Sequence, residues 1–248
     1  MSKLVLITGG SRGIGAATAL LAARQGYAVA VNYSANPLAA DEVVRQIRLA
    51  GGQAMTVQAD VSNEAQVVSM FEKIDAELGH VTALVNNAGV VDQAARVDAM
   101  TLQRLQRMFE VNVFGSFLCA REAVKRMSTR YGGAGGSIVN VSSAASRLGS
   151  PGQYVDYASA KGAIDTFTLG LAKEVADEGI RVNAVRPGII DTEIHASGGL
   201  PDRVRDAASQ LPMRRAGSAE EVAESIVWLL GDGASYSTGA LLDVAGGR

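Results

Sequence analysis

The sequence predicts an α/β fold in which one doubly wound sheet of about seven parallel strands carries helices on both faces. Short apolar runs of strand length alternate with longer segments of helical period along the whole chain. Runs that are apolar at nearly every position are typical of parallel strands buried on both faces. No segment rich in proline, serine or charge interrupts the alternation, so we expect a single domain over residues 1–248.

Four strands and three helices are expected in the first half of the chain. Gly26 ends the first helix, Pro37 opens the second, which stops at the Gly51–Gly52 pair, and Ser62 is the expected N-cap of the third. The predicted strands cover 4–8, 28–32, 54–58 and 81–85, and the predicted helices cover 14–25, 37–50 and 63–79.

The second half continues the alternation. A long helix is predicted at about 111–127, a strand at 137–141, a helix at 155–178 and a strand at 181–185. Ser218 and Glu221 match a capping box that opens a further helix, and a seventh strand covers 241–244. The least regular stretch, 191–217, follows the sixth strand at an edge where such folds bind ligands. We expect it to be a mobile substrate-binding lid.

Composition excludes several classes of protein. A formal net charge of −2 leaves no basic surface for nucleic acid or for an anionic membrane. No run approaches the ~20 apolar residues that span a bilayer. Cys119 is the only cysteine, so no internal disulfide is expected, and we expect a reducing, cytoplasmic compartment. We also expect the side chain of Cys119 to be buried. With His80 and His195 as the only histidines, no His/Cys metal site is expected.

A glycine-rich loop joins the first predicted strand to the first helix. Gly9 permits a tight turn, Gly13 lets the backbone approach a pyrophosphate, and Gly15 allows the helix to pack closely on the strand. The helix N-terminus offers free N–H groups and a positive dipole to the anion. In this strand–loop–helix context the loop predicts a Rossmann-type dinucleotide site. Its candidate cofactor ligands are Gly9, Ser11, Arg12, Gly13, Ile14 and Gly15.

The end of the second strand indicates which dinucleotide binds. Sites that select NAD usually place Asp or Glu there to hold the ribose 2′-hydroxyl. This chain has Asn32, Tyr33 and Ser34 instead, so no carboxylate repels a 2′-phosphate, and Arg12 could neutralise one. We therefore expect NADP (NADPH) to be favoured over NAD.

Tyr157 and Lys161 lie four residues apart near the start of a predicted helix and so project from one face. A phenol with an ordinary pKa of about 10 is a poor base at neutral pH, and a nearby ammonium favours its ionised form. The glycine loop, Asn86-Asn-Ala-Gly89 after the fourth strand and Pro187-Gly188 after the sixth accompany this pair.

Together these motifs resemble the short-chain dehydrogenase/reductase superfamily, in the shorter single-domain branch that includes 3-oxoacyl-carrier-protein reductases and glucose dehydrogenase-like enzymes. The resemblance covers essentially the whole chain. It implies an oxidoreductase that moves hydride between a nicotinamide cofactor and a carbonyl or secondary alcohol.

The resemblance also implies residue roles. Tyr157 would be the acid–base, Lys161 would lower its pKa and bind the nicotinamide ribose, Ser143 would hydrogen-bond the substrate oxygen, and Asn112 would anchor a water in a proton relay. Asp60 and Val61 would contact adenine. The remaining cofactor-lining residues implied by the resemblance are Asn87, Ala88, Gly89, Pro187, Gly188, Ile190 and Thr192.

Two assignments near the predicted centre keep alternatives. Ser142 and Ser143 both follow the fifth strand; Ser143 aligns better with the family, and Ser142 remains the alternative. Tyr154 has Ala158 four residues later, where Tyr157 has a lysine, so we expect Tyr154 to be a wall of the pocket.

The substrate is not evident from the sequence. The pocket is expected in the segments 93–98, 144–154 and 191–213, where no cluster of charged side chains selects a charged substrate. The residues expected to line it are Gln93, Arg96, Arg147, Tyr154, His195 and Met213.

Two other functions compete with a reductase of free carbonyl compounds. A 3-oxoacyl-carrier-protein reductase would need a basic docking patch, for which Arg126, Arg130 and Lys173 are candidates. A non-catalytic NADP-binding sensor is the alternative of another class, and the intact Tyr157 and Lys161 argue against it. The resemblance also implies a homotetramer or homodimer, with which the apolar faces of helices 111–127 and 155–178 agree.

Overall fold

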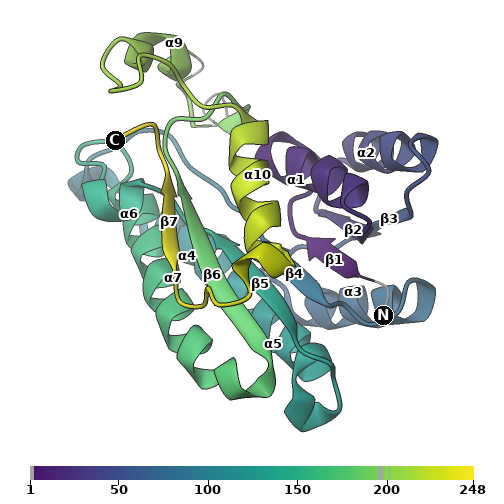
Figure 1. Cartoon of the computed structure of the whole chain (residues 1–248). Helices are drawn as coiled ribbons and strands as arrows, with labels where there is room; N and C mark the ends of the chain where they lie inside the picture. The colour runs from purple at the N-terminus through teal and green to yellow at the C-terminus, as the bar shows by residue number, and fades with distance from the viewer. Residues whose placement is uncertain (1–2, 195–197, 201) are drawn as a thin grey trace.

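The computed structural model describes residues 3–194, 198–200 and 202–248. Its centre is a sheet of seven parallel strands in the order β3-β2-β1-β4-β5-β6-β7 (Figure 1), which confirms the predicted fold class. The strands are β1 (Leu4–Ile7), β2 (Ala28–Tyr33), β3 (Ala54–Gln58), β4 (Ala83–Asn86), β5 (Gly136–Val141), β6 (Ile180–Pro187) and β7 (Leu241–Val244).

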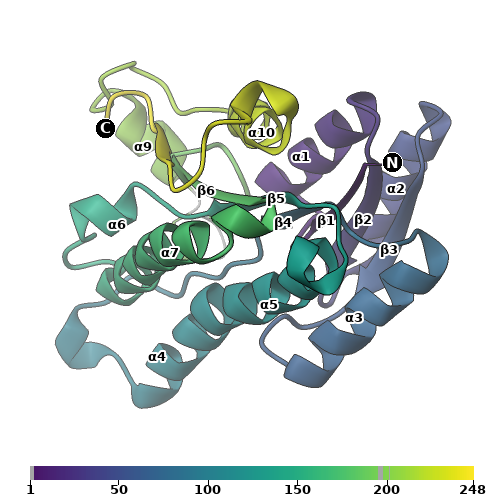
Figure 2. The ribbon, with the colours of Figure 1, turned by 60° about the horizontal axis from the view of Figure 1, so that its bottom comes forward.

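Helices cover both faces of the sheet, as Figure 2 shows along the strands. Side chains alternate across each strand, so β1 sends Val5 and Ile7 into one core and Leu4 and Leu6 into the other. The first core is closed by α1 (Gly13–Arg24), α2 (Pro37–Leu49) and α10 (Ala219–Leu230). The second is closed by α3 (Glu64–Glu77), α5 (Gly115–Met127) and α7 (Val155–Glu174).

The helix that ends in α5 begins earlier than the predicted residue 111. It starts with α4 (Leu102–Phe109), which Thr101 caps, and runs through a π-helical turn at Glu110–Phe114 into α5. The sequence analysis assigned no helix to the α4 segment, in which Met108 is the one buried residue.

Other boundaries also differ from the prediction, most by one or two residues. Asn63, and not Ser62, is the N-cap of α3, because the Ser62 hydroxyl donates to the Asp60 carboxylate at 2.6 Å. Helix α7 ends at Glu174, four residues early, and a 3₁₀ turn at Ala176–Glu178 follows it. Strand β6 is longer than predicted and continues to Pro187. Cys119 is fully buried, as predicted.

The segment after β6 leaves the sheet and returns to α10. Its described part contains α9 (Arg203–Ala208), and Ile190 pairs with Gly217 in a single parallel bridge. The short helix α6 (Ala145–Leu148) lies nearby, between β5 and α7. Within the described ranges, no helix is long and apolar enough to cross a membrane.

Candidate active site

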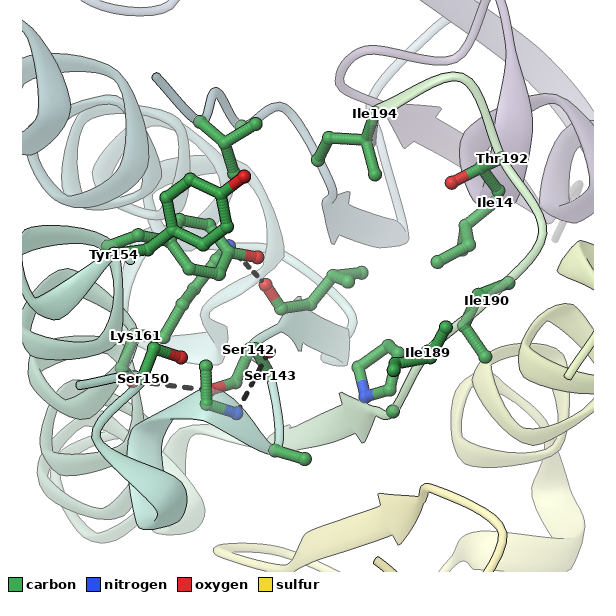
Figure 3. Close-up of a pocket in the computed structure, with 18 of the residues that line it drawn as sticks. Ile14, Ser142, Ser143, Ser150, Tyr154, Lys161, Ile189, Ile190, Thr192 and Ile194 are labelled. Carbon is green, nitrogen blue, oxygen red and sulfur yellow. Dashed lines mark hydrogen bonds between the residues drawn. The ribbon is translucent and has the colours of Figure 1, made fainter. Parts of the chain in front are cut away.

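A cavity opens at the carboxyl ends of the central strands (Figure 3). Strands β1 and β4 are neighbours at the point where the strand order reverses, which is the usual ligand site of a doubly wound sheet. The segments after β1, β4, β5 and β6 all reach the cavity. The lining includes Ile14, Asn87, Gly89, Ser142, Ser143, Tyr157, Lys161, Pro187, Gly188, Ile190 and Thr192.

The glycine loop is packed too tightly for side chains. Gly9 has a φ of +60°, and a Cβ on Gly15 would lie 2.4 Å from the Gly9 oxygen and 2.6 Å from Asn87 Nδ2. Among the described residues, no side chain caps the N-terminus of α1. The first N–H groups of α1 therefore face the cavity edge without a protein cap, and this arrangement fits a pyrophosphate.

Two asparagines brace this loop from behind. The Asn87 side chain donates to the main-chain oxygens of Thr8 and Gly9 at 2.9 and 3.0 Å. Asn32 accepts from Gly9 N–H at 3.1 Å and donates to the Ala59 oxygen at 3.1 Å. The Asn32 side chain is buried, and its hydrogen bonds go to the backbone. The sequence analysis predicted that this residue contacts the cofactor.

The other candidates beside the loop are arranged differently. Tyr33 is half-buried and Ser34 is exposed at the end of β2. Neither side chain is a carboxylate. The Asp60 carboxylate accepts from both Ser62 N–H and its hydroxyl, and also pairs with Arg107. Val61 is buried against the position of Gly115.

The strip after β6 lies across the glycine loop. A Cβ on Gly13 would lie 3.3 Å from the methyl carbon of Thr192, which shows how closely the two segments approach. Arg12 pairs with Glu193 at 3.3 Å, and both side chains are largely exposed. The strip that carries the predicted cofactor residues Ile190 and Thr192 thus lies against the glycine loop.

Tyr157 and Lys161 project from the first turns of α7 into the cavity (Figure 3 labels the lysine). Lys161 Nζ lies 5.6 Å from the centre of the Tyr157 ring and donates to the main-chain oxygen of Val141 at 2.7 Å. Ser143 lines the same cavity and lowers the pKa of the Tyr157 phenol. The helical spacing therefore brings the predicted acid–base pair together. The last residue of β5 supplies the carbonyl that holds the lysine, and the serine follows two residues later.

The two serines after β5 have different partners. The Ser142 hydroxyl donates to the main-chain oxygen of Lys161 at 3.1 Å and is buried. The Ser143 hydroxyl accepts from Ala145 N–H at 3.1 Å and faces Tyr157. The geometry thus favours Ser143 over Ser142 as the serine that meets a substrate oxygen.

Asn112 occupies the π-helical turn between α4 and α5 and is fully buried. Its amide nitrogen donates to the oxygens of Val90 and Met108 at 3.0 and 2.9 Å. A Cβ built on Gly89 would lie 2.8 Å from Asn112 Oδ1 and 3.6 Å from Lys161 Nζ, so both groups flank Gly89. Single π-turns are frequent at functional sites, and this one aims Asn112 toward the lysine side of the cavity.

Burial sets the protonation of the pair. It raises the pKa of Tyr157 to about 12, against a smaller lowering by the hydrogen bond from Ser143. It lowers the pKa of Lys161 to about 8, although the charge of Asp165 raises it. The expected lowering of the tyrosine pKa by Lys161 is not seen here, because the ammonium is bound to Val141 and not to the phenol.

The depressed pKa of Lys161 predicts how stability depends on pH. Between pH 8 and 10.5 this lysine binds more protons in the unfolded chain than in the folded one. Burial of the ammonium therefore lowers the free energy of unfolding below pH 8, and this destabilisation vanishes above pH 10.5. Replacing Lys161 with Met removes this destabilisation. From pH 7 to 10, the free energy of unfolding of the wild type should gain about 2 kcal/mol relative to the variant, measured by urea unfolding.

Lys173→Met provides the control, because Lys173 lies on the same helix at an exposed position. Its pH profile should run parallel to that of the wild type. A parallel profile for Lys161→Met as well would contradict the prediction.

The expected pocket residues were only partly right. Tyr154 is a buried wall, as predicted, and its phenol donates to the main-chain oxygen of Gly198 at 3.1 Å. Met213 borders a second hollow beside β7. His195 lies outside the described residues. Gln93, Arg96 and Arg147 are not among the residues that line the cavity.

Two arginines that the sequence did not single out do line the cavity. Arg203 comes from α9 and Arg248 is the last residue after β7. Basic side chains therefore reach the cavity, whereas the sequence analysis found no charged cluster in the expected pocket segments. Arg203 lay within the expected pocket segment, but nothing in the sequence pointed to Arg248, which only the path of β7 brings there.

The proposed carrier-protein patch lies away from the site. Arg126 and Arg130 precede β5, and Lys173 is near the far end of α7, so all three lie toward the amino ends of the strands (Figure 1). Arg126 is mostly buried between Asp75 and Glu122. These residues do not form a basic surface beside the cavity, so that prediction was wrong.

The chain is similar to known proteins over nearly its whole length. A family model described as "Enoyl-(Acyl carrier protein) reductase" matches residues 9–248. An uncharacterised oxidoreductase of Escherichia coli (strain K12) is 60% identical over 245 residues, which cover 99% of each chain. A 3-oxoacyl-[acyl-carrier-protein] reductase of Synechocystis is 38% identical over 247 residues, covering 99% of this chain and 96% of that protein. The solved structure of a double mutant of a Serratia marcescens short-chain dehydrogenase/reductase is 33% identical, with a TM-score of 0.89 over 100% of this chain and 98% of the other.

Proposed function

The chain belongs to the short-chain dehydrogenase/reductase family, and we propose that it is an NADP-dependent oxidoreductase that uses Tyr157 to interconvert a carbonyl and a secondary alcohol. Family membership makes it an oxidoreductase acting on hydroxyl or carbonyl groups. The observation that carries the finer proposal is the meeting of Ser143, Tyr157 and Lys161 in the cavity that adjoins the glycine loop. When bound, the nicotinamide cofactor supplies or accepts the hydride.

The residues of the chain would hold the cofactor along the groove already described. The uncapped N-terminus of α1 suits the pyrophosphate, the segment Asn87–Gly89 suits the middle of the molecule, and the strip Pro187–Thr192 suits the carboxamide end. Asp60 and Val61 stay candidates for the adenine end, and Asn112 for a proton relay.

In the reductive direction Tyr157 donates its proton to the developing alkoxide while Ser143 stabilises the same oxygen. A phenol whose pKa is raised to about 12 is protonated at neutral pH and is therefore ready to act as the acid. The tyrosinate left behind faces Lys161, whose ammonium stabilises it. In the oxidative direction the phenol must first lose its proton, so oxidation should be faster at higher pH.

A direct assay tests this function. The protein is incubated with NADPH or NADH and a panel of ketones, quinones, sugars and acyl thioesters, and loss of reduced cofactor is followed by its absorbance. We expect NADPH to be consumed with at least one class of carbonyl compound. Cofactor binding with no turnover of any carbonyl compound would contradict the proposal and favour the sensor alternative.

Arg12 is the proposed determinant for NADP. Its ion pair with Glu193 is exposed on both sides and therefore weak, so a 2′-phosphate can replace the carboxylate. Replacing Arg12 with Ala should lower the catalytic efficiency with NADPH about tenfold or more, and that with NADH about twofold or less. Arg24→Ala, at the other end of α1, is the control and should change neither. Equal losses with both cofactors would contradict a role in selecting the phosphate.

The 3-oxoacyl-carrier-protein reductase remains a second candidate because of the 38% identical relative. The structure lends no support to the docking patch that we expected for it, since Arg126, Arg130 and Lys173 lie at the opposite end of the sheet. Rates on a free ketone and on the matching carrier-linked acyl group would separate the two functions.

We also propose that the chain forms a homodimer or homotetramer. Exposed aromatic and aliphatic side chains gather along α5 and α7, where the rings of Phe117 and Phe167 stack with centres 3.8 Å apart and Phe114 and Leu169 are exposed. Sedimentation should give a species of two or four times the 25.7 kDa of one chain. Replacing Phe114 with Glu should shift it toward the smaller species, and a wild type of 25.7 kDa alone would contradict the proposal.

A further inference from the structure

Two arginines share the cavity that holds Ser143 and Tyr157. Arg203 begins α9 in the segment after β6, and Arg248 follows β7 at the end of the chain. Figure 1 shows α9 and the last residues at the same edge of the sheet. Positive charge thus reaches the substrate side of the site from two segments that are far apart in sequence.

The contacts of Arg203 orient its guanidinium without neutralising it. The carbon between its nitrogens lies 5.6 Å from the centre of the Tyr154 ring, and Nη1 donates to Gln153 Oε1 at 2.7 Å. Both partners are neutral. The Tyr154 phenol is itself bound to the main-chain oxygen of Gly198, so the wall beneath Arg203 is fixed by hydrogen bonds.

Arg248 is held through its main chain. Its carbonyl oxygen accepts from Arg147 Nη2 at 3.0 Å, and this contact anchors the end of the chain near α6. Burial and the charge of Arg203 both lower the pKa of the Arg248 guanidinium. Both residues line the same cavity, so their positive charges act on one site.

Within the described ranges, no Asp or Glu lies within 4 Å of either guanidinium. The acidic side chains of the neighbouring segments are paired with other arginines. These pairs are Asp202 and Asp206 with Arg205, Asp243 with Arg147 and Arg186, and Asp156 with Arg104. Two positive charges thus lie on the wall of the cavity without an Asp or Glu side chain beside them, and a bound anion would pair with both.

We propose that Arg203 and Arg248 bind an anionic group of the substrate, a carboxylate or a phosphate, while its carbonyl lies at Ser143 and Tyr157. The planar guanidinium fork matches both anions and can donate two parallel hydrogen bonds to each. This inference rests on the proposed function and gives its substrate a class: a carbonyl compound that carries a negative charge.

This anion site is separate from the one proposed for the cofactor. The 2′-phosphate is expected at Arg12, beside the end of β2, whereas Arg203 and Arg248 line the cavity together with Tyr154 and Leu148 on the α6–α7 side. Loss of either arginine should therefore leave the affinity for NADPH unchanged.

The test compares matched substrates that differ in charge. The pairs are 4-oxopentanoate with 2-pentanone, dihydroxyacetone phosphate with dihydroxyacetone, and the 3-oxobutanoyl thioester of phosphopantetheine with that of pantetheine. Each compound is assayed for catalytic efficiency, and its dissociation constant for the NADPH-loaded protein is measured by calorimetry. The proteins are the wild type, Arg203→Gln, Arg248→Gln and the double variant. Arg205→Gln is the control, because Arg205 lies on α9 but pairs with Asp202 and Asp206 outside the cavity.

We expect the charged member of at least one pair to bind about a hundredfold more tightly than its neutral partner. Each single replacement should weaken that member about tenfold, raise its KM more than it lowers kcat, and change the neutral member less than twofold. Arg205→Gln should behave as the wild type. The pair that shows the preference identifies the source of the anion: a keto acid, a keto phosphate, or a carrier-type phosphopantetheine.

Two results would overturn the inference. One is that no charged member binds more tightly than its neutral partner, including the case in which none binds at all. The other is a preference that survives in the double variant. Failure of the proposed function would look different, because charged ligands would still bind through the arginines although no carbonyl compound, charged or neutral, was reduced.

Discussion

Replacing Tyr157 with Phe is expected to lower the rate of carbonyl reduction about a thousandfold while NADPH affinity stays within about twofold of the wild type. In the proposed mechanism the phenol is the proton donor, and general acid catalysis of this kind contributes about 10²- to 10⁴-fold. The ring itself remains in place, so the cavity keeps its shape. Initial rates and cofactor titration, both at neutral pH, measure the two quantities.

Tyr154→Phe is the matched comparison for this variant. The two tyrosines line one cavity and both are largely buried, but the Tyr154 phenol donates to Gly198 and has no lysine four residues later. Removal of the Tyr154 hydroxyl should reduce the rate of carbonyl reduction about tenfold at most. A Tyr157→Phe protein that keeps a near wild-type rate, or one no slower than Tyr154→Phe, would remove Tyr157 from the mechanism.

Replacing Arg104 with Met is expected to destabilise the fold by about 3 kcal/mol or more. Arg104 donates from Nε and Nη2 to the two oxygens of Asp156 at 2.7 and 3.2 Å, and the Asp156 side chain is wholly buried. It also donates to the main-chain oxygen of Gln93 at 2.6 Å. Without the arginine, a carboxylate is left buried and unpaired beside Tyr157. Urea unfolding at a fixed protein concentration measures the loss.

The double variant Arg104→Met, Asp156→Leu separates the charge effect from lost packing. Removing both partners leaves no buried charge, so most of the lost stability should return. Arg107→Met, whose ion pair with Asp60 is half exposed, should cost less than about 1 kcal/mol. An Arg104→Met protein as stable as Arg107→Met would show that the buried carboxylate finds another partner.

The local rules of the sequence predicted the fold. Apolar runs such as that of β1 bury both faces, and the parallel pairing of β1 with β2 and β4 follows from the helices between them. The glycine loop and the Tyr157–Lys161 pair could be predicted from the sequence for a similar reason. Each depends on neighbours within one turn or one helix face, so the residues that matter are close together in sequence.

Errors arose where a local rule had two solutions. Ser62 and Asn63 are both good caps, and the choice fell to Asn63 because Asp60 engages the Ser62 hydroxyl. Asn32, at the end of β2, stays a predicted cofactor residue. The structure adds that its side chain completes hydrogen bonds of the glycine loop, because a buried amide must find partners.

The sequence by itself determined the parallel α/β fold, the nucleotide loop, and the tyrosine and lysine on one helix face. Only the tertiary structure decided which serine meets Tyr157, that Lys161 is held by the Val141 carbonyl, and that Arg203 and Arg248 share the cavity. The physical reason is distance along the chain. Helical and strand periods fix contacts between residues a few positions apart, whereas the meeting of β5 with α7, or of α9 with the end of β7, depends on how the whole sheet packs.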